Sequence, residues 1–246
     1  MKKIAIFSDI HGNLEALKAV EKDLKSKKDL DLVVCLGDIV GYYPHPVECI
    51  KIVREMCDIV IQGNHDAAVV APNFNEEMKG FNEVAKNSMI WTRDLLLKSS
   101  NTDNYNFLKG LSPQRPLNVG KKRILFVHGT PDDKWEYFLY PYWLNAPLDE
   151  QRIRLNEWLK KWDLIAMGHS HWAFQYENWE RMVINPGSVG QPRDDNPKSS
   201  YAIVEVTETR LKGQNFRINY DIEKTCKAVL SANLDKSLCD RIKQGH

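Results

Sequence analysis

The stretch "KIAIFSDIHGN" (residues 3–13) decides the fold, because it joins an apolar run, a polar turn and the start of a helix. The run is apolar without alternation, which is typical of a strand buried on both faces. The turn puts Asp9 and His11 directly after that strand. Asn13 is suited to cap a helix over 13–28, where apolar residues recur along one face. The stretch therefore predicts a strand–turn–helix unit.

Short apolar runs of the same kind recur along the chain and predict further strands. They lie at 32–36, 59–62, 124–127, 164–167, 182–185 and 201–206. Helical spacing is found between several of them, at 47–56 and 150–161. Strands that alternate with helices favour a layered α/β fold.

Two regions depart from this alternation. Residues 67–115 look mostly helical, and we expect them to form a small cap-like insertion outside the sheets. The end of the chain predicts two strands joined around Lys212 and Gly213, followed by a helix over 222–242. Because no repeat or linker divides the sequence, we expect one domain over residues 1–246.

Polar side chains follow five of the predicted strands, and five of the seven histidines are among them. In open α/β sheets, ligands bind at the carboxyl ends of the strands. The residues are Asp9, His11, Asp38, Asn64, His65, Asp66, His128, His169 and His171. Each motif alone is weak, but five strand ends with the same chemistry indicate a site rather than ordinary polar turns. Oxygen and nitrogen donors without thiolate suit Mn²⁺, Fe, Zn²⁺ or Ni²⁺ better than a structural zinc site.

These blocks resemble the five motifs of the calcineurin-like metallophosphoesterases, in the same order. The motifs are "SDIHGN", "GDIVG", "GNHD", "VHG" and "GHSH", and "NPGSVGQPR" (185–193) extends the match. The sequence is similar to a small bacterial and archaeal branch that includes YfcE-like phosphodiesterases and diadenosine-tetraphosphatase-like proteins. The resemblance implies a four-layer α/β/β/α sandwich of two mixed sheets, with the helical insertion as a cap.

The resemblance also implies a site for two divalent metal ions. Asp9, His11, Asp38 and His171 would hold one ion, while Asp38, Asn64, His128 and His169 would hold the other, so that Asp38 bridges them. Mn²⁺ is the expected metal, with Fe, Zn²⁺, Ni²⁺ or Co²⁺ as alternatives. His65 would be the catalytic acid or cation, and Asn64, His65 and Arg193 would contact the substrate. A hydroxide that bridges the metals would then hydrolyse a P–O bond.

The expected substrates are small phosphodiesters or nucleotides, with dinucleoside polyphosphates as the sharpest expectation. A phosphomonoesterase stays an alternative. A protein phosphatase is disfavoured, because Gly41 and Tyr42 stand where those enzymes carry an Asp and an Arg. This departure leaves His65 without an assigned orienting partner. A non-catalytic scaffold of the same fold would be expected to lack the catalytic histidine, which this chain keeps.

The sequence leaves two interpretations open for Arg193 and two for an aromatic stretch that precedes residue 144. Arg193 ends a loop rich in Gly and Pro, which could bind an anion or could be a tight structural turn. An aromatic stretch could stack on a nucleobase, although core packing or a subunit interface is the commoner use. Its members are Trp135, Tyr137, Phe138, Tyr140, Tyr142 and Trp143.

Composition limits the partners. The net charge of +1 gives no basic field for long nucleic acids or a membrane surface. Five scattered cysteines without a close pair favour a reducing compartment, and we expect a cytoplasmic protein. No apolar run approaches the length of a membrane span. The expected partner is a small phosphoester or nucleotide substrate, and a homo-oligomer stays open.

Overall fold

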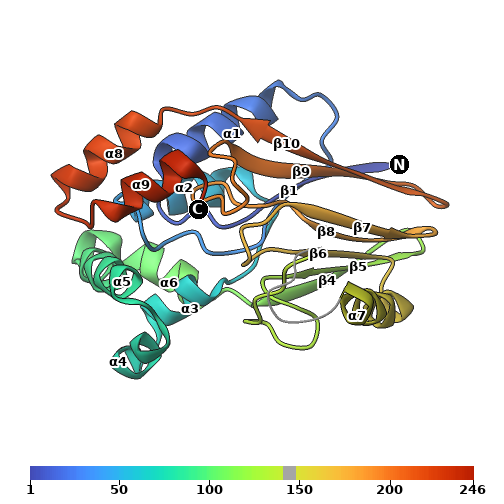
Figure 1. Ribbon diagram of the computed structural model, residues 1–246, viewed down its shortest axis with the longest axis horizontal. Coiled ribbons are helices and arrows are strands. Elements are labelled where there is room, and N and C mark those ends of the chain that lie inside the picture. Colours follow the sequence, from blue (N-terminus) through green and yellow to red (C-terminus); the bar gives the residue numbers. More distant parts are fainter. Residues whose placement is uncertain (141–147) are drawn as a thin grey trace.

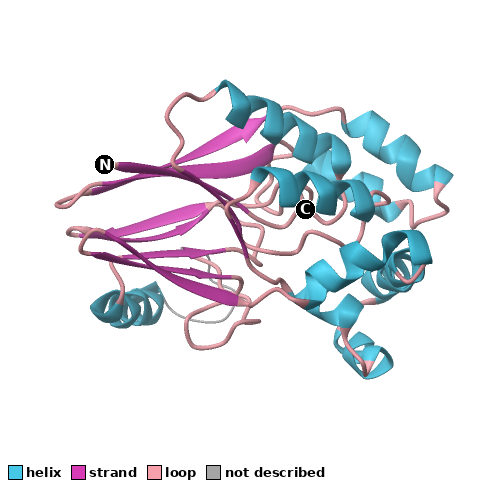
Figure 2. Cartoon of the chain, turned by 180° about the vertical axis from the view of Figure 1, so that it is seen from behind, coloured by secondary structure: helices cyan, strands magenta, loops and turns pink. Residues whose placement is uncertain are grey.

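Two five-stranded sheets lie face to face, with helices on both outer faces (Figures 1 and 2). The computed structural model describes residues 1–140 and 148–246. The first sheet has the order β10 (Leu211–Ile218), β9 (Ser199–Val206), β1 (Lys2–Phe7), β2 (Leu32–Cys35) and β3 (Ile59–Val60). The second has the order β4 (Gln114–Val119), β5 (Lys122–Val127), β6 (Leu164–Met167), β8 (Arg181–Asn185) and β7 (Phe174–Asn178). The predicted four-layer α/β/β/α sandwich is confirmed.

Both sheets are mixed, and their parallel strands carry the predicted apolar runs. β1, β2 and β3 pair in parallel, as do β5, β6 and β8. In β1, Ile4 and Ile6 pack between the two sheets, while Ala5 and Phe7 pack under the helices. Each fully buried side chain of this size stabilises the fold by about 1.5–3 kcal/mol. Because both faces are buried, these runs show no alternation with polar residues.

Helices α1 (Leu14–Ser26) and α2 (Pro46–Met56) cover the first sheet, and α7 (Leu148–Lys161) covers the second. Leu17, Val20 and Leu24 form the buried face of α1. Asn13 Oδ1 accepts a hydrogen bond from the Ala16 amide at 3.3 Å, so the predicted cap is confirmed. A strand end and the following helix are therefore fixed together, and the polar turn is held between them.

The segment between β3 and β4 is helical, as predicted. It contains α3 (Asn64–Val70), α4 (Phe74–Glu77), α5 (Glu83–Leu96) and α6 (Thr102–Lys109), with 3-10 turns at Met78–Gly80 and Ser99–Asn101. These helices lie together beside the strand ends (Figure 1). The last residues of the predicted insertion, 114 and 115, belong instead to β4. Among the described residues, no helix is long and apolar enough to cross a membrane.

The C-terminal prediction was wrong in two details. The turn between β9 and β10 lies at Thr207–Arg210, where the Thr207 hydroxyl accepts from the Arg210 amide at 2.9 Å. Lys212 and Gly213 lie inside β10, where a Cβ on Gly213 would come within 2.8 Å of Met182 Sδ. The predicted single helix is two helices, α8 (Ile222–Ser231) and α9 (Ser237–Gln244). Asn233 adopts a left-handed conformation (φ +54°) and separates them.

The sequence did not predict β4 and β7. Both are antiparallel outer strands of the second sheet, with compositions "QRPLNV" and "FQYEN". An outer strand is paired on one side only, so it tolerates polar residues and a proline such as Pro116. These strands therefore lack the continuous apolar run that marked the others.

Candidate active site

The turns after β1, β2, β3, β5 and β6 meet at one edge of the two sheets. Their backbones are linked directly, since the Asp9 amide donates to Gly37 O at 3.0 Å and the His11 amide to Asp38 O at 2.9 Å. A Cβ on Gly37 would lie 2.3 Å from the Gly63 amide nitrogen, so glycine permits this approach. Five predicted ligands have left-handed backbone, namely Asp9, His11, Asp38, His169 and His171, with φ between 52° and 64°. Such strain outside glycine is uncommon and concentrates at functional sites.

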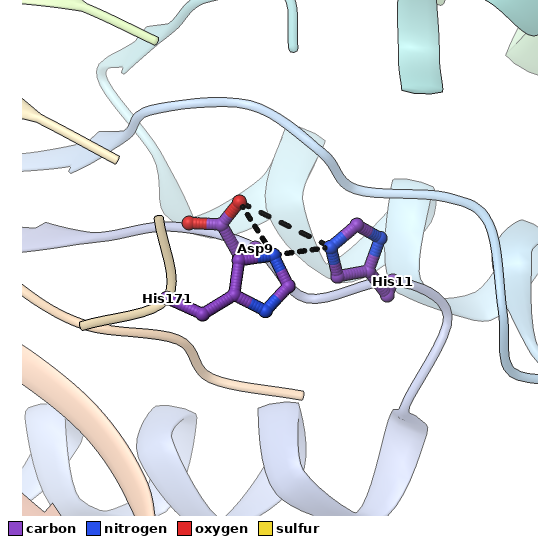
Figure 3. A group of neighbouring side chains, drawn as sticks. All are labelled: Asp9, His11 and His171. Carbon is purple, nitrogen blue, oxygen red and sulfur yellow. Dashed lines mark hydrogen bonds and ion pairs between the residues drawn. The ribbon is translucent and has the colours of Figure 1, made fainter. Parts of the chain in front are cut away.

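Asp9, His11 and His171 form a first group of possible metal ligands (Figure 3). His171 Nε2 lies 3.3 Å from Asp9 Oδ1 and 3.0 Å from His11 Nε2. All three side chains are at most 2% exposed. Two residues that are far apart in the sequence, His11 and His171, thus present nitrogens to the same carboxylate.

Asp38, His128 and His169 form a second group, and Asn64 lies next to it. His128 Nε2 is 3.4 Å from Asp38 Oδ2 and 3.2 Å from Asn64 Oδ1. Asp38 Oδ2 is also 3.7 Å from His11 Nε2, which belongs to the first group. The Asp38 carboxylate therefore lies between the two groups, at the position of the predicted bridge.

Backbone carbonyls orient three of the imidazoles. His11 Nδ1 lies 3.2 Å from Val40 O, His128 Nδ1 2.7 Å from Leu36 O, and His171 Nδ1 2.5 Å from Gln191 O. A carbonyl only accepts, so each Nδ1 carries the donated proton, and each ring, in its neutral form, directs its Nε2 lone pair inward.

These inward lone pairs fit a cation. The His11 and His171 Nε2 atoms, 3.0 Å apart, would otherwise bring two acceptors together. In the described part of the chain, Asp9 Oδ1 and Asp38 Oδ2 are buried and receive no hydrogen bond. An uncompensated buried carboxylate is costly, and a metal ion would satisfy both carboxylates and the imidazoles.

Burial and neighbouring charges shift the pKa values of the histidines in the second group. Burial alone would lower the pKa of His128, but the Asp38 carboxylate raises it to about 9. Burial, together with the neighbouring His128, lowers the pKa of His169 to about 3. Without a metal, a proton on His128 would therefore balance Asp38, at the place where a divalent ion would bind. This pattern is typical of functional sites.

His65 also lines the site, but its ring is not among the three imidazoles that backbone carbonyls orient. Its Nδ1 is buried and has no hydrogen-bond partner among the described residues. Its ring meets those of His11 (centroids 4.7 Å apart), Tyr42 (5.0 Å) and Phe81 (4.9 Å). Asp66 does not orient it, because the Asp66 carboxylate accepts from three backbone amides, those of Ile39, Val40 and Gly63. The orienting partner of His65 stays unassigned, as the sequence left it.

A cavity of about 430 Å³ opens over both groups. Asn64, His65, His169, His171 and Arg193 line it, so all three predicted substrate contacts reach one space. Glu77, Gly80, Phe81 and Asn82 of the helical insertion form part of its wall. The location of Arg193 beside these ligand groups favours the anion-binding interpretation over a structural turn on the surface.

The aromatic stretch divides between the cavity and the core. Trp135 lines the cavity and meets the His128 ring, and Tyr137 meets the His169 ring at 5.5 Å. Phe138 and Tyr140 pack in the core beneath α7. Tyr142 and Trp143 lie outside the described residues. Core packing is therefore one use of the stretch, and Trp135 is its described member that lines the cavity.

Sequence reasoning missed Phe81, Tyr42 as a wall of the site, and Gln191. Phe81 belongs to an insertion without a recognisable motif, so no signal marked it. Tyr42 follows the "GDIVG" block directly, and Gln191 lies inside "NPGSVGQPR", so their positions in these motifs were available signals.

Comparison with known proteins assigns this geometry to a family. The calcineurin-like phosphoesterase superfamily domain matches residues 1–209. The chain belongs to this superfamily. It is 32% identical to the uncharacterized protein MJ0912 of Methanocaldococcus jannaschii, over 97% of this chain and 96% of that protein. It is 24% identical to the phosphodiesterase YfcE of Escherichia coli K12, over 83% of this chain and 88% of YfcE.

A solved structure agrees with this assignment. The metallophosphoesterase from Sphaerobacter thermophilus has 32% sequence identity and a TM-score of 0.76, covering 100% of this chain and 99% of its own. This phosphoesterase is therefore a metal-dependent phosphoric ester hydrolase of the YfcE-like branch. Its candidate ligands for divalent ions are the two groups above and an overlapping group of His11, Asp38 and His65.

Proposed function

We propose that this phosphoesterase binds two divalent metal ions and hydrolyses small phosphodiesters or nucleotides. The observation that carries the proposal is the convergence of unpaired carboxylate oxygens and imidazole lone pairs in two groups that share Asp38. Asp9, His11, Asp38 and His171 would hold one ion. Asp38, Asn64, His128 and His169 would hold the other.

The metals would supply a hydroxide at neutral pH and would polarise the phosphate oxygens. The protein's own side chains would bind and orient the substrate and assist the leaving group. Asn64 and Arg193 would bind the phosphate oxygens of the substrate and orient phosphorus. His65, which lies beside both groups, would give a proton or a positive charge to the departing alkoxide. Buried Asp66 would fix the turns that carry Asp38 and His65, through its three backbone hydrogen bonds.

The cavity supports a small substrate. Its volume of about 430 Å³ suits a nucleotide or a similar diester, and Phe81 and Trp135 offer aromatic wall for a base or another ring. A dinucleoside polyphosphate would extend beyond this space along the open side. Mn²⁺ is the metal that we propose, and the cytoplasm is the compartment; long nucleic acids and membranes are not proposed partners.

The test is turnover by metal-stripped protein that has been reloaded with Mn²⁺. Four substrates would be compared: p-nitrophenyl phosphate, bis-p-nitrophenyl phosphate, a nucleoside 2′,3′-cyclic phosphate and diadenosine tetraphosphate. We expect the diesters to give a higher kcat/KM than the monoester, and we expect His65→Ala to abolish most of this activity. His45→Ala is the matched control, because half-buried His45 has its ion-pair contact with Glu48, at 3.9 Å, and does not line the cavity.

Each result separates the alternatives. A preference for the monoester would make the chain a phosphomonoesterase and overturn the proposed substrate class. Equal turnover by wild type and His65→Ala would overturn the role of His65. If the protein bound two metals and turned over none of the four substrates, the proposed substrates would be wrong, and a scaffold of the same fold would be favoured.

A further inference from the structure

The loop "NPGSVGQPR" contains a buried polar residue, Gln191, whose hydrogen bonds reach both sides of the site. Its side chain is fully buried. Its backbone carbonyl accepts from His171 Nδ1 at 2.5 Å, and its Oε1 accepts from Arg193 Nη2 at 2.9 Å. Gln191 thus contacts one candidate metal ligand and the candidate anion-binding residue.

Gln191 is itself fixed by Tyr43. Its Nε2 donates to the Tyr43 hydroxyl at 3.2 Å, and that hydroxyl donates to the Leu238 carbonyl of α9 at 3.3 Å. Tyr43 is fully buried, so each of these groups would lose a costly hydrogen bond if its partner were removed. An unbroken chain of hydrogen bonds therefore runs from Arg193 through Gln191 and Tyr43 to the C-terminal helix.

Helix α9 and Gly245, the residue that follows it, contact the same region at two more points. The Asp195 amide donates to Gly245 O at 3.0 Å, two residues beyond Arg193. Arg241 lies over the ring of Tyr42, 5.7 Å from its centroid, and Tyr42 in turn meets His11 and His65. Apolar side chains of α8 and α9 form one buried cluster with Tyr42 and Tyr43. The superfamily match ends at residue 209, so this helical pair lies beyond it.

We propose that Gln191 is a positioning residue for Arg193, and that Tyr43 and helix α9 hold Gln191 in place. Two hydrogen bonds from opposite directions give the Gln191 amide one orientation, with its oxygen toward the guanidinium. The Arg193 side chain, which loses many rotamers when it is ordered, is then preorganised to receive the substrate's phosphate. This inference rests on the proposed contact between Arg193 and substrate.

The test is a double-mutant cycle between Gln191→Met and Arg193→Ala, measured as KM and kcat for the best diester in the Mn²⁺-loaded protein. Methionine keeps the length of the side chain, but its thioether is only a weak acceptor for Arg193 and cannot donate to Tyr43. We expect Gln191→Met to raise KM about fivefold with kcat changed less than twofold, as for the loss of one hydrogen bond. In the double variant, KM should equal that of Arg193→Ala alone, because Gln191 acts only through Arg193.

Tyr43→Phe is the second variant, since it removes one hydroxyl and keeps the ring in its packing. We expect it to raise KM about two- to threefold and to add nothing to Gln191→Met. Tyr176→Phe is the matched control, because that hydroxyl donates to Asn156 Oδ1 at 2.8 Å, on the outer face of the second sheet. Metal content measured on every variant excludes an effect through His171.

The outcomes are distinct. If the effects of Gln191→Met and Arg193→Ala on KM multiply, Gln191 does not act through Arg193 and the positioning role is overturned. If Tyr43→Phe has no more effect than Tyr176→Phe, the link to α9 is overturned. If Arg193→Ala leaves KM unchanged, the proposed substrate contact itself fails, and the inference fails with it.

Discussion

The two groups of candidate ligands differ in how firmly the protein holds them. In the first group, His11 and His171 are both oriented by carbonyls, and no member is more than 2% exposed. In the second group, His169 and Asn64 are half-buried where they line the cavity, which His171 of the first group also reaches, and only His128 is among the carbonyl-oriented histidines described above. The first group is therefore the more deeply buried and the more firmly oriented of the two, while the second contains two half-buried residues, Asn64 and His169, that line the cavity.

This difference indicates that the two metal sites have different roles, one in tight metal binding and the other in substrate coordination. A rigid, buried ligand set has less entropy to lose on metal binding, so the first site should bind its ion more tightly. Half-buried ligands beside a cavity leave coordination positions for the substrate, as catalytic metal sites require. The following predictions test this comparison, from the largest expected effect to the smallest.

Asp38→Asn removes the charge that both groups share. We expect both metals to bind more weakly and kcat to fall by about 10³-fold or more, because metal ions contribute several kcal/mol to such reactions. The measurements are metal content and kcat for bis-p-nitrophenyl phosphate. The control is Asp58→Asn, because the Asp58 carboxylate accepts from the Val33 amide at 2.8 Å on the protein surface. Near-normal kcat in Asp38→Asn would show that Asp38 is no bridge.

His65→Ala leaves both groups intact. We expect kcat to fall by about 10²-fold while both metals stay bound, since general-acid help is removed. The loss should be greater for a diester with an alkyl leaving group than for one that releases p-nitrophenolate, because p-nitrophenolate departs without a proton. An equal loss for both leaving groups would contradict proton donation by His65.

His171→Ala and His169→Ala separate the two sites. Each should weaken one metal by at least about tenfold. His171→Ala should weaken the tighter ion and His169→Ala the weaker one, as measured by titration of metal-free protein with Mn²⁺. His45→Ala should change neither affinity. If both variants weakened the same ion, the division into two groups would be wrong.

The pH dependence of metal binding reports on His128. With a pKa of about 9, this histidine carries a proton in metal-free protein at neutral pH, and the ion must displace it. Affinity for the second metal should therefore rise about tenfold for each pH unit up to about 9, with release of one proton. Calorimetry in two buffers of different ionisation enthalpy measures this proton. Binding without proton release would show that His128 is neutral before the metal arrives.

The sequence predicted the parts of the fold that are buried on both faces. The run at 3–7 and the similar apolar runs could be predicted as strands from local sequence alone, because a continuous apolar composition is typical of a central strand. The outer strands β4 and β7 were not predicted, because outer strands tolerate polar residues and these two therefore lack a continuous apolar run. The break between α8 and α9 depends on the left-handed Asn233, which hydrophobic spacing does not reveal.

The candidate site was predictable for a different reason. Five residues follow the same rule, that ligands gather at the carboxyl ends of strands, here at the shared edge of the two sheets. They are Asp9, Asp38, His128 and the two histidines of "GHSH". Phe81 reaches the cavity through tertiary packing, which no local pattern encodes. The hydrogen bonds of Gln191 likewise depend on side chains far away in the sequence, from Tyr43 to Leu238.

The most direct test of two cooperating metals is a titration of metal-free protein with Mn²⁺, in which bound ion and turnover of bis-p-nitrophenyl phosphate are followed together. We predict that the first equivalent fills the buried group with little activity, and that activity appears with the second. Full activity at one equivalent, or no binding beyond one, would contradict the two-metal account.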